Sequence, residues 1–207
     1  EWPVVFLGCM LAGVVPVAAN TLLTAKDFEF MLRDSRAQML FVSQPLWPAF
    51  EPFAGALPDL QSVVHAGTQG PDSVAALIAA GDAAHQVAPT CADDAAFWLY
   101  SSGSTGAPKG TVHLHSHLIQ TAELYACPIL GIRENDVVYS AAKLLFAYGL
   151  GNGLTFPTSA GATAVLPPSR PTPSRAPMPP ACPAADARPT TSPSVAGRSR
   201  PGLRRRR

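Results

Sequence analysis

The apolar positions of residues 1–166 switch repeatedly between the period of a helix and the short runs of a buried strand. Strand–helix–strand units of this length predict an α/β fold, a parallel sheet with helices on both faces. The predicted strands are 14–18, 39–42, 62–65, 96–100, 111–113, 137–140 and 163–166. The predicted helices are 4–11, a segment that follows Thr24, 47–57, 74–80, 117–126 and part of 143–156.

Two of the predicted helices carry start signals. Thr24 is a typical N-cap, and Asp27 at position N3 takes the place of the Glu of a capping box. The helix that follows has its apolar residues, Phe28 among them, on one face. Ser116 is predicted to cap the helix at 117–126.

Residues 3–19 contain no polar side chain, which raises the question of a membrane span. The stretch is at the short end of the roughly 17–25 residues that a span needs. Gly13 and Pro16 interrupt it. We therefore expect a buried helix that ends before Gly13, followed by a buried strand, and no membrane insertion.

Charge and aromatic content change abruptly near residue 167. Residues 1–167 hold 6 Lys/Arg and 13 Asp/Glu, whereas residues 168–207 hold 9 Arg and a single acid. No aromatic residue follows Phe156, and proline is abundant in 168–207. Such a segment buries too little apolar surface to fold. We expect a partial domain at 1–167 and a disordered Pro/Arg-rich tail at 168–207, encoded out of frame.

Two further observations narrow the class of protein. The acidic part at 1–167 argues against a nucleic-acid partner. The four cysteines, Cys9, Cys91, Cys127 and Cys182, form no CxxC pair and no framework spacing. Scattered cysteines are typical of reduced thiols in a cytoplasmic protein.

A glycine- and hydroxyl-rich loop lies between the predicted strands at 96–100 and 111–113. It reads Ser101-Ser-Gly-Ser-Thr-Gly-Ala-Pro-Lys-Gly110. Glycines allow close approach of the backbone to an anion, so N–H groups and hydroxyls can surround phosphate oxygens. Lys109 adds a positive charge. The spacing is not that of a Walker A loop, since two residues separate Gly103 from Gly106 and no Gly-Lys-Ser/Thr follows.

This loop closely resembles the ATP-binding signature of the adenylate-forming superfamily of acyl-CoA synthetases, luciferase and adenylation domains. The resemblance extends from about Trp2 to Leu166 and implies part of the large N-terminal domain of such an enzyme. It implies ATP, Mg²⁺ and coenzyme A as cofactors and catalytic roles for Thr105 and Lys109. The nucleotide-binding residues that it implies are Ser101, Ser102, Gly103, Ser104, Thr105, Gly106, Lys109 and Gly110.

A second segment, Lys143-Leu-Leu-Phe-Ala-Tyr-Gly-Leu-Gly-Asn152, resembles the aryl-pocket segment of benzoate and hydroxybenzoate CoA ligases. The resemblance implies an aromatic carboxylate as substrate. An aromatic wall beside small residues suits a flat ring. A glycine-rich loop with core aromatics is the alternative. The residues assigned to the ring are Phe146, Ala147, Tyr148 and Gly149.

His113, His115 and His117 alternate, and on a strand they would share one face. No carboxylate or cysteine is placed to complete a first ligand shell, so we predict no metal site there.

The resemblance also implies downstream parts: an aromatic-Gly-x-Thr-Glu segment, a ribose-binding Asp and a C-terminal domain with a catalytic lysine. No Thr-Glu dipeptide occurs in the sequence. We therefore expect a fragment of an aryl-CoA ligase that is inactive alone. Two alternatives stay open: a non-catalytic nucleotide-binding module whose basic tail binds a partner or nucleic acid, and a ligase for another acyl substrate.

Overall fold

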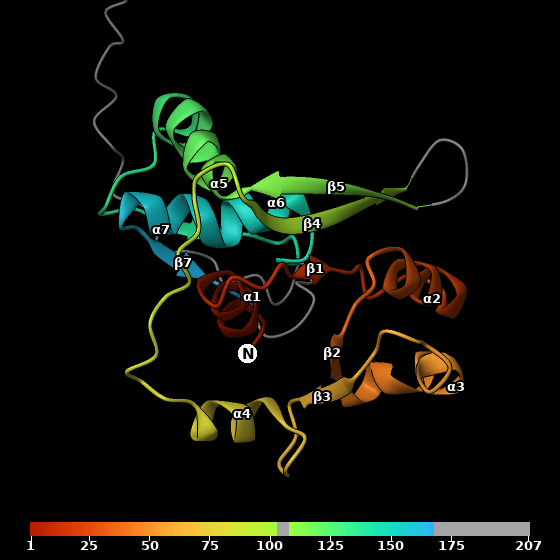
Figure 1. The fold of residues 1–207 in the computed structure, drawn as a ribbon. Helices are drawn as coiled ribbons and strands as arrows, with labels where there is room; N and C mark the ends of the chain where they lie inside the picture. The colour runs from red at the N-terminus through yellow and green to blue at the C-terminus, as the bar shows by residue number, and fades with distance from the viewer. Residues whose placement is uncertain (103–107, 168–207) are drawn as a thin grey trace, which may run out of the picture. The chain divides into compact units, whose positions relative to one another are not determined.

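Helices and strands alternate along the chain in the order that the hydrophobic pattern predicts (Figure 1). The computed structural model describes residues 1–102 and 108–167; the predicted tail at 168–207 lies outside them. The strands are β1 (Val17–Ala18), β2 (Met39–Ser43), β3 (Ser62–Ala66), β4 (Ala95–Ser102), β5 (Pro108–Leu114), β6 (Val137–Tyr139) and β7 (Thr163–Val165). The α-helices are α1 (Trp2–Leu11), α2 (Ala25–Asp34), α3 (Glu51–Ala54), α4 (Val74–Ala80), α5 (His115–Thr121), α6 (Ala147–Leu150) and α7 (Phe156–Ala160). A 3-10 helix η1 (Gln44–Ala49) and π-helices η2 (Ala122–Leu130) and η3 (Gly151–Thr155) complete the described elements.

The described strands form three small sheets, with orders β1-β4-β5, β2-β3 and β6-β7. The pairs β1–β4, β2–β3 and β6–β7 are parallel, as the strand–helix–strand pattern predicts. The pair β4–β5 is antiparallel. A parallel pair needs a crossover of a dozen or more residues. The segment 103–107 between the two strands is too short for that, so β4 and β5 form a hairpin.

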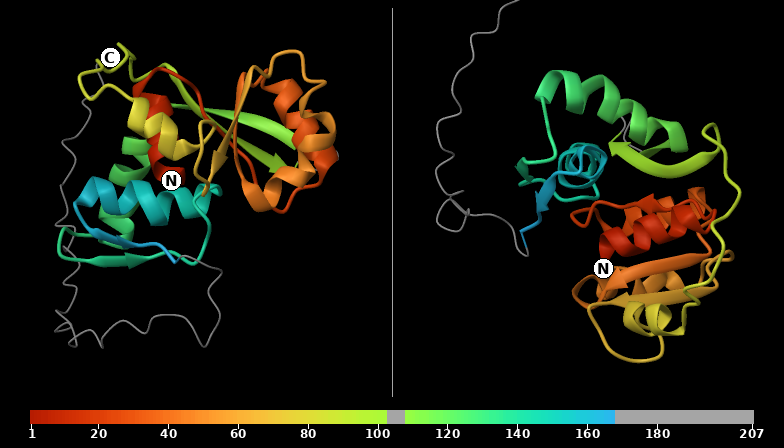
Figure 2. Two further views of the ribbon diagram at one scale, coloured as in Figure 1. Left: turned by 90° about the horizontal axis from the view of Figure 1, so that it is seen from below. Right: turned by 90° about the vertical axis from the view of Figure 1, so that its left-hand side faces the viewer.

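The strand β4 lies at the centre of the first core cluster, which joins three distant parts of the sequence. Phe6 and Met10 of α1 pack with Phe97 of β4 and with Leu150 at the end of α6. The Phe6 and Phe97 rings meet edge to face with their centroids 5.4 Å apart. Figure 2 shows α1 running beside the strands of the hairpin. Burial of apolar side chains thus fixes β4 against helices from both ends of the described chain.

The helix α2 starts as its sequence predicts and packs into a second core cluster. The Asp27 N–H donates to Thr24 Oγ1 at 3.3 Å, and the Thr24 N–H donates to Asp27 Oδ2 at 3.1 Å. Both halves of the capping box are therefore present. Phe28 is buried against Phe50, with ring centroids 4.4 Å apart.

The prediction of a buried first helix and strand is correct for one face only. Val4 and Leu11 are each 56% exposed, although the helix α1 contains no polar side chain. The reason is that the described neighbours cover only the side that carries Phe6 and Met10. The strand β1 is also shorter than the predicted 14–18. In the described part of the chain, no helix is long and apolar enough to cross a membrane.

The predicted start and end of the helix at 117–126 are wrong. The helix α5 begins at His115, and the Leu114 N–H donates to Nδ1 of His117 at 3.2 Å. The N-cap is therefore Leu114 and not Ser116, and the side chain of His117 at N3 accepts from the N-cap N–H. The helix then widens into η2 and continues to Leu130, with Pro128 inside the π-helical segment.

Replacing Thr24 with Ala should lower the free energy of unfolding by about 1 kcal/mol, because the backbone N–H of Asp27 loses its acceptor. Urea unfolding followed by circular dichroism measures the change. Thr24→Ser keeps a hydroxyl acceptor and should stay close to the unsubstituted protein. Equal losses for Ala and Ser would contradict a capping role.

Candidate nucleotide and carboxylate site

The hairpin β4–β5 presents the two ends of the predicted phosphate loop side by side. Ser101 lies opposite Lys109, and Tyr100 lies opposite Gly110. The side chains of Ser101 and Lys109 are both exposed. A hydroxyl and an ammonium group therefore stand together where β4 enters the loop and β5 leaves it.

Most of the predicted loop residues lie outside the described part of the chain. These are Gly103, Ser104, Thr105 and Gly106, together with the side chain of Ser102. The catalytic role of Thr105 thus stays a prediction. The structure places only Ser101, Lys109 and Gly110 of the set in full.

Gly110 fits its position because two aromatic rings lie against its backbone. A Cβ added there would be 3.1 Å from Cε3 of Trp98 and 3.2 Å from Cζ of Tyr100. Few real contacts of a Cβ are that close. The last glycine of the signature is therefore explained by packing within the hairpin, beside any contact that it makes with phosphate.

Tyr100 makes a contact with α2 that the sequence does not predict. The Tyr100 hydroxyl donates to Oδ2 of Asp34, the last residue of the helix, at 2.5 Å. Burial, and after it the hydrogen bond to the Asp34 carboxylate, raises the pKa of Tyr100. A single aromatic residue before a loop, 66 positions from its partner, gives no sequence signal for such a pair.

The predicted aryl segment forms the turn into α6. Phe146 is extended and precedes the helix, and its side chain is 40% exposed. Tyr148 is 72% exposed, whereas Gly149 is buried. A Cβ at Gly149 would collide with the carbonyl of Lys143, since the carbonyl carbon lies 2.6 Å away.

Both candidate segments are attached to β4. The hairpin strand leads into the loop, and Leu150 at the end of α6 packs on Ala96 and Phe97 of the same strand. The ammonium group of Lys143 also lies 2.9 Å from Oγ1 of Thr21. The fold thus brings the aryl segment to the strand that carries the phosphate loop, although the two lie some 40 positions apart in sequence.

The histidine trio is divided between β5 and α5, so its members do not share a strand face. The His113 ring stacks on Phe97 with centroids 4.6 Å apart and meets the His117 ring edge on at 5.7 Å. Burial, and then the neighbouring His117, lowers the pKa of His113. Among the described residues, no group of three or more His, Cys, Asp or Glu side chains is placed to hold a metal ion.

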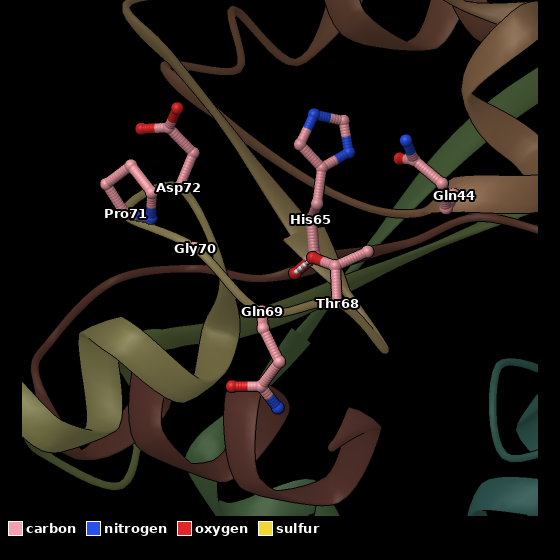
Figure 3. A pocket seen from close by; sticks show the side chains of 7 residues that line it. All are labelled: Gln44, His65, Thr68, Gln69, Gly70, Pro71 and Asp72. Carbon is pink, nitrogen blue, oxygen red and sulfur yellow. Dashed lines mark hydrogen bonds between the residues drawn. The ribbon is translucent and has the colours of Figure 1, made fainter.

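A shallow hollow of about 300 Å³ lies at the end of β3 and involves none of the predicted site residues. Figure 3 shows His65 and Asp72 on its rim and the hydrogen bond of 3.3 Å from the Thr68 hydroxyl to the His65 carbonyl. Nδ1 of His65 is buried and has no hydrogen-bond partner among the described residues, and the His65 ring meets the Trp47 ring at nearly a right angle with centroids 5.3 Å apart.

The fold and the loop signature agree with the comparisons to known proteins. The sequence profile of the AMP-binding enzyme family matches residues 1–193. The chain therefore belongs to the AMP-binding enzyme family, as the adenylate-forming signature predicts.

Among its relatives are aryl-CoA ligases. The chain is 64% identical over 173 residues to a benzoate–CoA ligase of Thauera aromatica and 46% identical over 174 residues to a 4-hydroxybenzoate–CoA/benzoate–CoA ligase of Rhodopseudomonas palustris. A benzoate CoA ligase structure from Burkholderia xenovorans LB400 matches 83% of the chain at 53% identity with a TM-score of 0.71. An anthranilate CoA ligase structure matches 82% of the chain at 37% identity with a TM-score of 0.78. The chain spans about a third of the length of these relatives. Of its own residues, 84% align with the first ligase and 83% with the second.

Alkaline pH should destabilise the fold through Tyr100, whose ordinary pKa is 10.0. Because the folded state holds this proton more tightly, it binds more protons than the unfolded chain above that pH. The Tyr100 contribution is complete below about pH 10 and is lost as the pH rises further. Urea unfolding on both sides of pH 10 should show the loss. Tyr100→Phe should reduce the fall in unfolding free energy with rising pH, whereas Tyr139→Phe should leave that fall unchanged.

Gly149→Ala should lower the free energy of unfolding by about 3 kcal/mol, because the added methyl group overlaps the Lys143 carbonyl. Gly8→Ala is the matched control, since nothing lies within 4 Å of a Cβ there. It lies inside α1 and should stabilise by about 0.5–1 kcal/mol. Chemical denaturation of both variants tests the pair, and a neutral Gly149→Ala would contradict the close packing.

Proposed function

We propose that residues 1–167 form part of the AMP-binding domain of an ATP-dependent aryl-CoA ligase and contribute its phosphate-binding loop. The observation that carries the proposal is the signature Ser101–Gly110, which connects the strands β4 and β5 of the hairpin. Ser101 and Lys109 are exposed where these strands meet the connecting segment. The 64% identity to a benzoate–CoA ligase supports an aromatic carboxylate as the substrate.

The described residues of the loop signature carry groups that suit the binding of a polyphosphate. Lys109 offers an exposed ammonium group, Ser101 offers an exposed hydroxyl opposite it, and Gly110 keeps the aromatic rings close without a side chain of its own. Ammonium and hydroxyl groups are donors that phosphate oxygens accept well. We assign Lys109 and Thr105 to the stabilisation of charge on the β- and γ-phosphates. Mg²⁺, when bound, would neutralise further phosphate charge.

The proposed reaction has two steps. A carboxylate oxygen of the aromatic acid attacks the α-phosphorus of ATP, the bond to the bridging oxygen breaks, and pyrophosphate leaves. The coenzyme A thiol then loses its proton, its sulfur attacks the acyl carbon, and AMP leaves with the electrons of the broken bond. The loop residues act in the first step by positioning phosphates and neutralising their charge.

The aryl segment is proposed to contact the ring of the carboxylate. Phe146 and Tyr148 are exposed, so their rings are accessible to a flat ligand. Ala147 leaves room beside them. Gly149 is buried against the Lys143 carbonyl, and its contribution is to let the chain turn tightly behind the ring site.

Lys109→Ala should weaken ATP binding by the 207-residue chain about tenfold, because a charged donor to phosphate is worth roughly 1.5 kcal/mol or more. Isothermal titration calorimetry with Mg-ATP measures the affinity. Lys26→Ala removes an exposed lysine of α2 and controls for net charge. Equal affinities for the two variants would contradict the assignment of Lys109.

Benzoate-dependent exchange between ATP and pyrophosphate tests the catalytic part of the proposal. We expect no exchange with the 207-residue chain alone, because it aligns with only a third of the length of relatives that perform the whole reaction. Measurable exchange would overturn this expectation. Salt-dependent binding of nucleic acid by residues 168–207 would instead favour a non-catalytic nucleotide-binding module.

A further inference from the structure

The outer end of the hairpin β4–β5 extends beyond its neighbouring strand. The strand β1 pairs with Trp98 and Leu99 and ends there. Residues 100–102 and 108–110, here called the projecting end, therefore form a two-stranded ribbon that leads into the phosphate loop. Two-stranded hairpins are at best marginally stable in water. The positions of Ser101 and Lys109 thus depend on what holds the projecting end.

Tyr100 connects the projecting end to α2. Its hydroxyl donates to the Asp34 carboxylate at 2.5 Å, a length typical of a strong bond to a charged acceptor. Among the described residues, this is the one side-chain hydrogen bond that the projecting end makes. The Tyr100 ring also lies against Gly110 of the opposite strand. One side chain therefore contacts the opposite strand of the ribbon and the helix α2. Figure 1 shows α2 near the outer part of the hairpin.

The helix α2 is a firm support for this contact. Its N-terminus is held by the capping box, and Phe28 and Met31 are buried to 1% and 3% exposure. Asp34 is its last residue, where a negative charge meets the negative end of the helix dipole. The hydroxyl of Tyr100 offsets that unfavourable placement.

We propose that Asp34 and Tyr100 are positioning residues that hold the projecting end on α2, so that Ser101 and Lys109 stay in place for a bound phosphate. The inference rests on the proposed function of the loop. Neither residue needs to touch the nucleotide. Loss of the contact releases the ribbon beyond Leu99, while the two core clusters remain intact.

Amide hydrogen exchange without nucleotide tests the positioning itself. Tyr100→Phe and Asp34→Ala should each speed exchange of those amides of the projecting end that bond across the hairpin about fivefold, because one hydrogen bond is lost. Amides of β2 and β3 should exchange at unchanged rates. Asp34→Asn keeps an acceptor oxygen and should restore most of the protection. Tyr139→Phe is the matched control.

Calorimetry with Mg-ATP then measures the consequence for binding. Tyr100→Phe and Asp34→Ala should each weaken affinity about fivefold, and the double variant should be no weaker than either single variant, because both remove the same contact. Asp34→Asn should stay within about twofold of the unsubstituted chain.

The two measurements separate the inference from the proposed function. If the unsubstituted chain binds no ATP, the proposed function fails, and hydrogen exchange still decides whether the contact positions the hairpin. If the chain binds ATP and the variants show unchanged exchange and unchanged affinity, the positioning role is wrong. A double variant whose loss of binding free energy equals the sum of the two single losses would also overturn the positioning role, since the two residues would then act separately.

Discussion

The packing of α1 and α6 on β4 is the contact on which the described part of the chain depends. Phe97, only 2% exposed, lies between Phe6 and the ring of His113, and Leu150 covers the same cluster from α6. Burying one such aromatic side chain contributes about 2–3 kcal/mol. The strand fixed in this way leads directly into the predicted phosphate loop, so apolar burial determines where Ser101 and Lys109 stand.

The polar side chains of the hairpin become more exposed to water from its inner end to its outer end. At its inner end the pKa of His113 is lowered, chiefly by burial, which favours a neutral ring stacked on Phe97. At its outer end Ser101 and Lys109 remain in water. Tyr100 lies between the two environments, with a half-buried ring and a hydroxyl on the Asp34 carboxylate. The hairpin therefore keeps charge away from the core and presents it only where the loop begins.

The elements with a clear hydrophobic period could be predicted from the sequence, and so could the Thr24 capping box. The antiparallel β4–β5 pair follows from the shortness of the connection, although the pattern of the individual strands does not show it. The start of α5 could not be predicted, because its N-cap is the apolar Leu114 and because His117 takes the N3 role that Glu or Gln has in a capping box. The loop signature could be identified from the sequence because its residues are contiguous. The Tyr100–Asp34 contact could not, because it depends on how β4 and α2 pack.

The buried Gly149 has a consequence for which positions of the predicted aryl segment can vary. Its backbone faces the Lys143 carbonyl with no room for a side chain, so this position is closed to variation by the covalent chain itself. The neighbouring Phe146, Ala147 and Tyr148 are exposed and carry no such restriction. Under the proposed function, adaptation to a ring with a different substituent therefore has three adjustable positions and one fixed position, and a directed-evolution library is best concentrated on those three.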